Sequence, residues 1–235
     1  MDWQLLLAAV KRAQAAYAND EGAAQAAFEA LGHAWVGWYE NGDHQACLTR
    51  DAVGAVCLSI SGTRFGRSAG DLLDDAYILP TDLGAGARVT SGAYAGMDVL
   101  WAWATSLVPA GTVWHVAGHS LGGQRALLTG LFVPADEIGS ISAFEAPKTC
   151  NAALWERLAP SLAKATCVCN GDDLWFGWPI VSEWMHPPLP HIHLLAAGFE
   201  IVEPGHSPLA LNDADHAVEL VDLRIAAIAN SRVPV

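Results

Sequence analysis

The sequence predicts a single α/β domain in which a mostly parallel β-sheet is covered by helices on both faces. Its 235 residues are 52% hydrophobic and 16% charged, which is ample apolar material for a packed core. Strand-like apolar runs alternate with helical patterns through the centre of the chain, an order typical of parallel sheets. The sequence contains no internal repeat, low-complexity stretch or linker. We therefore expect residues 1–235 to form one domain.

The N-terminal part of the chain changes from helical to strand-like periodicity. Residues 1–31 are rich in Ala and carry apolar residues at helical spacing, with one interruption at 19–22. Short apolar or aromatic runs separated by Gly and Asp then predict three strands. These strands are expected at 34–39, 45–49 and 55–60. A loop over 62–70 and a short helix over 71–76 are expected to follow.

The central and C-terminal parts alternate strands with helices. A helix is expected over 93–107, where apolar residues recur at spacings of three and four. Further strands are predicted at 113–117, 138–144 and 165–169, and helices at 121–131 and 152–158. Beyond Asn170 the chain is irregular and rich in Trp and Pro. A hairpin over 192–202, with Gly198 near its tip, and a final helix over 215–230 complete the prediction.

The charge balance excludes several classes of function. Lys and Arg number 12 against 25 Asp and Glu, which gives a net charge of −13 and a pI near 4.9. The basic residues are scattered, so no stripe exists to neutralise phosphates or to dock on an anionic membrane. We therefore expect no nucleic-acid partner. Stable membrane insertion is not expected either, because no apolar run approaches the roughly 18 residues that a membrane helix needs.

The N-terminus does not have the pattern of a secretory signal. Met1-Asp2-Trp3-Gln4 is acidic where a signal peptide is basic, and the short apolar run over 5–10 is followed by Lys11-Arg12. The expected localisation is therefore cytoplasmic, or outside the cell by a route without a Sec signal. The chain has five Cys residues, an odd number that favours reduced thiols. Cys47 and Cys57 are symmetric about position 52 in a predicted hairpin and could face each other, although buried free cysteine is common.

The stretch Gly118-His119-Ser120-Leu121-Gly122 carries the clearest chemical signal. It is a Gly-x-Ser-x-Gly pattern between a predicted strand and a predicted helix, where a sharp turn exposes the serine hydroxyl as a nucleophile. The small residues Gly118 and Gly122 permit the strained backbone. The backbone N–H of Leu121, at the start of a helix, can stabilise an oxyanion. The alternative is an ordinary serine in a Gly-rich turn, which the strand and helix context disfavours.

A nucleophilic serine needs an imidazole base and a carboxylate that orients the imidazole. In sheets of this type the chain order is Ser, then an acid, then His. Two acids, Asp172 and Asp173, follow the predicted strand 165–169, at the end where the crevice beside the serine is expected. The late histidines are His206 and His216. The pattern alone leaves both choices open.

Four stretches of the chain resemble the class 3 (fungal-type) triacylglycerol lipases, a branch of the α/β-hydrolases. One resembles the strand that ends in that family's oxyanion loop, one its Asp-Trp-x-x-Asp, one its Val-His-x-Gly-Phe, and one its serine turn. In order, they are Val56-Cys57-Leu58-Ser59-Ile60-Ser61-Gly62-Thr63, Asp71-Leu72-Leu73-Asp74-Asp75, Val89-Thr90-Ser91-Gly92-Ala93-Tyr94 and Gly118-His119-Ser120-Leu121-Gly122-Gly123-Gln124. Their order and spacing make the resemblance specific.

The resemblance implies an α/β-hydrolase fold and selects among the candidate residues. The family's acid lies in Asn-x-x-Asp, which matches Asp173, and its histidine follows an Asp, which favours His216 over His206. Thr63 would supply the second oxyanion donor beside Leu121. The family often carries an amphipathic lid after the oxyanion loop, and the stretch 65–79 is its candidate here.

The chain departs from the family pattern at two positions. Ser61 stands where Arg is usual before Gly-Thr, and Thr90 replaces the His of Val-His-x-Gly. These departures affect the side chains that would brace the oxyanion loop and leave the triad intact. In the candidate lid, Asp71, Asp74 and Asp75 dilute the apolar face, which favours soluble or micellar esters over lipid droplets.

The Trp-rich stretch after the acid has two interpretations. Trp175 and Trp178, together with Trp184, can line a substrate pocket or fill a surface core. His191 and His193 lie on one face of a predicted strand, a geometry that zinc can use, but no third ligand is evident. We therefore predict Trp175 and Trp178 as substrate-binding residues and predict no metal.

Together these observations predict a carboxylic ester hydrolase, a lipase or esterase, that acts through an acyl-enzyme and requires no cofactor. The expected partner is a small-molecule or lipid ester. Because a protonated imidazole cannot act as base, activity is expected to fall at acid pH. The alternatives are an acyltransferase or peptidase that uses the same triad, and a non-catalytic ligand-binding module of the same fold. The sequence does not predict the oligomeric state.

Overall fold

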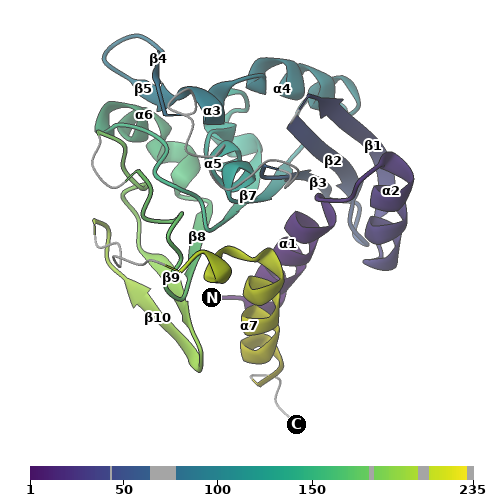
Figure 1. Ribbon diagram of the computed structural model, residues 1–235. Coiled ribbons are helices and arrows are strands. Elements are labelled where there is room, and N and C mark those ends of the chain that lie inside the picture. The colour runs from purple at the N-terminus through teal and green to yellow at the C-terminus, as the bar shows by residue number, and fades with distance from the viewer. Residues whose placement is uncertain (43, 64–77, 180–182, 206–211, 232–235) are drawn as a thin grey trace.

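The computed structural model describes residues 1–42, 44–63, 78–179, 183–205 and 212–231. Its main element is an eight-stranded sheet in the order β1-β2-β3-β6-β7-β8-β9-β10 (Figure 1). A separate two-stranded sheet joins β4 and β5. The strands are β1 (Ala34–Asn41), β2 (His44–Arg50), β3 (Val56–Ile60), β4 (Pro80–Asp82), β5 (Arg88–Thr90), β6 (Trp114–His119), β7 (Ile138–Phe144), β8 (Ala165–Asn170), β9 (His191–Leu195) and β10 (Gly198–Val202).

The centre of the main sheet is parallel and its edges are antiparallel. Strands β3, β6, β7, β8 and β9 pair in parallel. Strands β1 and β2 at one edge, and β10 at the other, join by antiparallel pairing. Because the five parallel strands end at the same edge, the loops that follow them converge there. The predicted mostly parallel sheet is confirmed.

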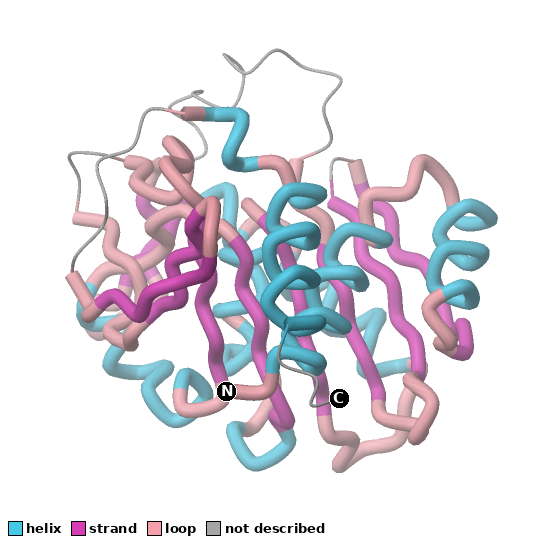
Figure 2. The backbone as a smooth tube through the Cα atoms, turned by 90° about the horizontal axis from the view of Figure 1, so that it is seen from below, coloured by secondary structure: helices cyan, strands magenta, loops and turns pink. Residues whose placement is uncertain are grey.

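Helices cover both faces of the sheet (Figure 2). On one face, α1 and α7 pack together against β6, β7, β8 and β9 through Val10, Phe144, Val168 and Ile225. On the other face, α3 to α6 pack on the sheet in a core that includes Leu58, Met97, Ile141 and Trp155. The helices are α1 (Trp3–Ala15), α2 (Glu21–Ala30), α3 (Ser91–Tyr94), α4 (Met97–Ser106), α5 (Leu121–Leu127), α6 (Ala152–Leu162) and α7 (Val218–Ser231).

Three predicted helices are divided, shortened or displaced in the structure, and the helix expected over 152–158 extends to Leu162 as α6. The helix expected over 93–107 is divided into α3 and α4, because Gly96 between them adopts φ = 68°, a left-handed conformation. The helix expected over 121–131 ends as an α-helix at Leu127 and continues as a 3₁₀ turn. The last helix begins only at Val218, so that His216 lies on the preceding 3₁₀ turn, Asp213–His216.

Of the two alternatives for Cys47 and Cys57, the structure shows buried free cysteines and not a facing pair. In the β2–β3 register, Cys57 lies opposite Thr49, and Cys47 lies opposite Ser59. The hairpin is thus centred one residue later than its sequence symmetry suggests, because Asp51 accepts hydrogen bonds from Val53 and Ala55 in the turn. All five cysteines are buried free thiols. Burial raises the pKa of the Cys57 thiol, which keeps it protonated.

Some sequence predictions fall outside the described residues. The predicted loop 62–70 is described only at Gly62 and Thr63, and the lid candidate 65–79 only at Ile78 and Leu79. The predicted helix 71–76 and the candidate base His206 lie wholly outside them. Within the described ranges, no helix combines the length and apolar character needed to cross a membrane.

Candidate active site

Ser120 lies on a strained turn between β6 and α5. Its backbone has φ = 58° and ψ = −126°, which is costly for a residue with a side chain, and its N–H donates to Phe144 O at 2.9 Å. The two glycines of the motif make the turn possible. A Cβ on Gly118 would overlap the carbonyl oxygen of Gly122, and a Cβ on Gly122 would overlap that of Ile60. Backbone atoms of this turn and of β3 therefore lie in direct contact at the two glycines, and the Ser120 side chain projects from the turn.

A continuous chain of hydrogen bonds joins Ser120, His216 and Asp173. The Nε2 atom of His216 is 2.8 Å from Ser120 Oγ, and its Nδ1 is 2.9 Å from Asp173 Oδ2. Asp173 is buried and also accepts the backbone N–H groups of Trp175 (2.8 Å) and Phe176 (3.2 Å). Because a carboxylate only accepts, Nδ1 of His216 carries the hydrogen, and Nε2 is free to accept the proton of the Ser120 hydroxyl. The structure thus brings the three predicted residues together in the order that nucleophilic catalysis requires.

The loops that carry the acid and the base are fastened to each other by Asp215. Its Oδ2 accepts the backbone N–H of Asp172 (2.9 Å) and the amide of Asn212 (2.9 Å). Arg224, on α7, donates to Asn170 at 2.6 Å and pairs with Asp215 at 3.3 Å. Asn170 in turn donates to the Asp215 carbonyl at 2.6 Å. The residue before His216 is therefore structural, and it holds the two loops at a constant separation.

The structure separates the two acids that the sequence pattern left open. Asp173 is 2% exposed and bonded to His216, whereas the neighbouring Asp172 is exposed at the surface. Although the two residues are adjacent in sequence, the carboxyl group of Asp173 lies in the site and that of Asp172 lies in solvent. The second candidate base, His206, lies outside the described part of the chain.

A cavity opens above Ser120. Thr63 and Leu121 line it on either side of the serine, and the predicted substrate-binding residues Trp175 and Trp178 also line it. The complete lining is Tyr17, Thr63, Ile78, Thr90, His119, Ser120, Leu121, Gln124, Pro147, Lys148, Trp175, Trp178, Pro179 and His216. Trp184 is not among these residues. Its indole N–H instead donates to Ile78 O at 3.0 Å in the core.

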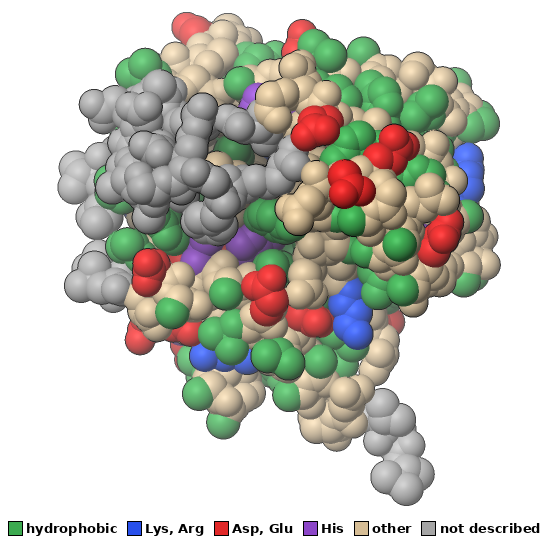
Figure 3. Space-filling model, turned by 45° about the vertical axis from the view of Figure 1, so that its right-hand side comes forward, with side chains coloured by type: hydrophobic (Ala, Val, Ile, Leu, Met, Phe, Trp, Pro, Cys, Tyr) green, Lys and Arg blue, Asp and Glu red, His purple; other side chains and the backbone are tan. Residues whose placement is uncertain are grey.

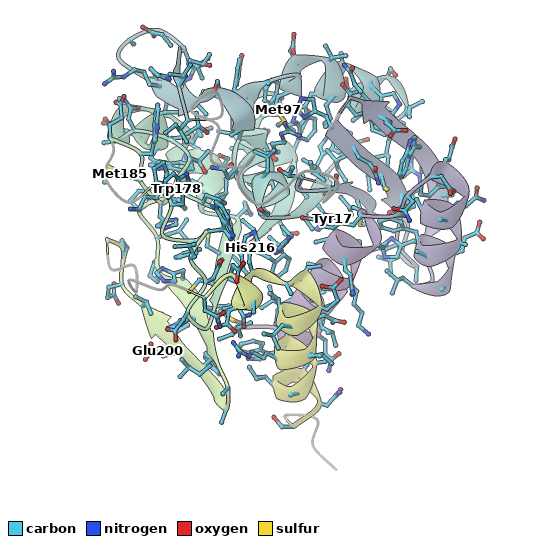
Figure 4. All side chains as sticks on the ribbon, in the orientation of Figure 1. Tyr17, Met97, Trp178, Met185, Glu200 and His216 are labelled. Carbon is cyan, nitrogen blue, oxygen red and sulfur yellow. The ribbon has the colours of Figure 1, made fainter. Side chains whose placement is uncertain are left out.

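The lining residues come from segments far apart in the sequence. Figure 4 labels Tyr17, His216 and Trp178 on three separate segments near the centre of the molecule. The ring of Trp175 lies 6.3 Å from that of His216 and 6.4 Å from that of Trp178. In Figure 3, histidine side chains lie in a recess bordered by hydrophobic side chains. The recess therefore offers an apolar surface next to the hydroxyl and the imidazole.

Beneath the triad lies a second buried group of polar side chains that the sequence analysis did not single out. His119 places Nδ1 2.7 Å from the Tyr17 hydroxyl, and its Nε2 is 2.9 Å from both Glu145 Oε2 and the carbonyl oxygen of His216. Burial, and the nearby His216, lower the pKa of His119, while burial raises the pKa of Glu145. Glu145 directly follows β7, the strand that pairs with β6. Its position at the end of a predicted strand was the only feature of the sequence that could have placed it near the site.

No metal site is assigned among the described residues. His119, Glu145 and His216 have ligand atoms within 4.8 Å of one another, but each already bonds within the site. The pair His191 and His193 lies on β9, where His193 bonds Glu200 at 2.9 Å and Gly171 O at 2.7 Å. The side chain of His193 is thus structural. That the chain needs no metal stays a prediction.

The fold is that of the fungal lipases. No protein-family model and no curated protein match the chain. Similar solved structures include a mono- and diacylglycerol lipase from Aspergillus oryzae, at 18% identity and a TM-score of 0.73, covering 92% of this chain and 95% of that one. Lipase II from Rhizopus niveus has 18% identity and a TM-score of 0.70, with 91% and 92% covered. A triacylglycerol lipase whose catalytic centre is a serine protease triad has 15% identity and a TM-score of 0.69, also with 91% and 92% covered. The predicted α/β-hydrolase fold is confirmed.

Proposed function

We propose that this chain is a serine hydrolase that cleaves carboxylic esters, with Ser120 as nucleophile, His216 as general base and Asp173 as its orienting acid. The observation that carries the proposal is the unbroken hydrogen-bond chain from Ser120 Oγ through His216 to Asp173, at 2.8 and 2.9 Å, at the floor of an apolar cavity. The shared fold with fungal lipases supports the same reaction class.

The reaction proceeds in two steps of acyl transfer. In the first, His216 Nε2 takes the proton of Ser120 as Oγ attacks the ester carbonyl, and the imidazolium then protonates the departing alcohol. In the second, His216 deprotonates a water molecule that attacks the acyl-enzyme, and it returns the proton to Ser120. The carboxylate of Asp173 stabilises the imidazolium that forms in each step.

Two backbone N–H groups are suited to the oxyanion of the tetrahedral intermediate. Leu121 is the first residue of α5, so its N–H has no partner within the helix. Thr63 follows β3 and lines the cavity beside Ser120. Donors fixed in advance at this point stabilise the developing charge without reorganisation. The hydroxyl of Thr63 is buried and has no partner among the described residues, so it is available as a further donor.

The cavity wall favours an ester with an apolar acyl group. Trp175 and Trp178, together with Ile78, Pro147 and Pro179, are among its apolar lining residues. Among similar structures, one is named for mono- and diacylglycerols and another for triacylglycerols, which extends the substrate class to lipid esters. The acids at 71, 74 and 75 favour soluble or micellar esters within that class.

The test is hydrolysis of p-nitrophenyl esters from acetyl to palmitoyl by wild type and by Ser120→Ala. The wild type is expected to be active and the variant to retain at most about one part in 10⁴ of its rate. A fluorophosphonate probe should label the wild type alone. Folded wild-type protein that neither hydrolyses any ester nor takes up the probe would contradict the proposal and favour a ligand-binding module. Hydrolysis of amides, or acyl transfer to alcohols in preference to water, would instead identify a peptidase or an acyltransferase.

A further inference from the structure

Glu145 is energetically costly where it stands. It follows β7 with φ = 49°, a left-handed conformation that is unfavourable for a residue with a side chain. It is also 0% exposed, and a carboxyl group buried in this way loses its hydration. Two unfavourable features in one residue, at the end of the strand next to the nucleophile turn, indicate a role that compensates for them.

The hydrogen atoms around His119 can be assigned from the groups that it meets. The carbonyl oxygen of His216 only accepts, so Nε2 of His119 carries the hydrogen and shares it with Glu145. Nδ1 then accepts from the Tyr17 hydroxyl at 2.7 Å. Tyr17 in turn accepts the backbone N–H of Gly62. One line of bonds therefore joins the oxyanion loop, the serine turn and the backbone of the base.

Glu145 is the last side chain in this series of hydrogen bonds and lies next to His216. Its carboxyl oxygen lies within 4.8 Å of a ring nitrogen of His216 and bonds His119 at 2.9 Å. The negative side chains of Asp173 and Asp215 lie nearby, and together with burial they raise the pKa of Glu145. The geometry places the Glu145 carboxyl group as an acceptor for the His119 N–H, while Asp173 holds the other side of the His216 ring.

We propose that Glu145 is a positioning residue for the hydrolysis: it holds His119, and His119 holds the backbone of His216, so that Nε2 of His216 stays against Ser120. The inference rests on the proposed function. Without the Glu145 oxygen, only the His216 carbonyl accepts from Nε2 of His119, so the imidazole ring of His119 loses one of the contacts that fix its orientation. The base is then free to shift, and small shifts in a reacting pair are costly in rate.

A matched pair of variants tests this positioning. Glu145→Gln and Glu145→Met are both unbranched, similar in volume and uncharged, and both occupy the same strained backbone, but only Gln retains an oxygen acceptor for His119. Steady-state hydrolysis of p-nitrophenyl acetate gives kcat and KM for each. We expect Glu145→Gln to keep kcat within about threefold of wild type and Glu145→Met to lose roughly tenfold or more. KM should change little in either variant, because Glu145 does not line the cavity.

Two further variants separate positioning from loss of stability. Leu100→Ala removes a buried side chain of α4 far from the triad and should lower the melting temperature while leaving kcat unchanged. Glu145→Gly suits the left-handed backbone, so it carries the test if the Met variant does not fold, and it should show the same loss of kcat. Wild-type kcat in Glu145→Met or Glu145→Gly, or equal losses in the Gln and Met variants, would overturn the inference. Failure of the proposed function has a different signature, because wild type itself would then be inert.

Discussion

Replacing Asp173 by Asn is expected to lower kcat/KM for ester hydrolysis by about three orders of magnitude. The carboxylate and the imidazolium that forms in the transition state lie in direct contact, at 2.9 Å between Oδ2 and Nδ1. At an effective dielectric constant near 20, unit charges about 4 Å apart attract by about 4 kcal/mol, and each 1.4 kcal/mol is about tenfold in rate. Asn retains the shape of Asp173 but removes this attraction.

The hydrogen bonds of Asp173 predict the same direction. Oδ1 accepts the N–H of Trp175, while Oδ2 accepts both the N–H of Phe176 and Nδ1–H of His216. An Asn side chain can place oxygen on only one of these two sides. Its NH₂ group then either faces the Trp175 N–H, donor against donor, or faces His216 and favours the tautomer that cannot accept from Ser120.

The adjacent acid provides the control for this variant. Asp172→Asn removes the same charge one residue away, at an exposed side chain, and should change kcat/KM by less than about twofold. Both variants are compared with wild type on p-nitrophenyl acetate near pH 8, after circular dichroism has shown that they are folded. An Asp173→Asn enzyme that keeps more than about a tenth of wild-type kcat/KM would refute the reasoning, as would an equal loss in Asp172→Asn.

Three other predictions concern packing, pH and substrate. Gly122→Ala would place a methyl group against a carbonyl oxygen of β3 and should lower the free energy of unfolding by about 2 kcal/mol or more. The control Gly22→Ala in α2, where a methyl group meets only an Asp20 oxygen at 3.4 Å, should not destabilise the protein, and coinciding melting curves for the two variants would contradict the prediction. Burial lowers the pKa of His186 to about 3 and that of His191 to about 4, against 6.5 in the unfolded chain, so the folded protein loses stability progressively as the pH falls from 6.5 toward 4. Guanidinium unfolding at pH 7 and at pH 5 measures this loss, and equal stabilities at the two pH values would contradict the prediction. Trp175→Ala should raise KM for an octanoyl ester roughly tenfold more than for an acetyl ester, and an unchanged chain-length profile would remove this residue from the acyl site.

The elements that the sequence predicted well are those specified by local patterns. Strand β7, at Ile138–Phe144, is reproduced to the residue, and Gly198 lies next to the tip of the β9–β10 hairpin, as expected, because it pairs with Leu195 across the turn. The serine turn was recognised from its local Gly-x-Ser-x-Gly pattern, although only Gly118 is required by a contact within the turn and Gly122 is required by the approach of β3. Where bounds failed, a single backbone conformation decided the outcome, as at Gly96, which no periodicity of apolar residues reveals.

The site was harder to predict where it depends on contacts between distant segments. Asp173 could not be separated from Asp172 by pattern, because the choice rests on which carboxyl group faces His216, 43 residues further along the chain. Tyr17 is 102 residues from its partner His119, and nothing in its helical surroundings marks it as part of a site. The short β4–β5 pair was missed because strands of three residues carry too little pattern.

Ser120 and Glu145 show how the chain places its strain. Both have side chains and positive φ, and each directly follows one of two adjacent parallel strands, β6 and β7. The Ser120 N–H donates to the carbonyl of Phe144, the residue before Glu145, so the two turns are hydrogen-bonded neighbours. A turn that exposes the serine also directs the glutamate inward beneath the serine turn. The strained backbone of Ser120 exposes the nucleophile, and on our proposal that of Glu145 directs a side chain that positions the base. Replacing either residue by Gly would therefore relieve the backbone strain but lower the rate of hydrolysis.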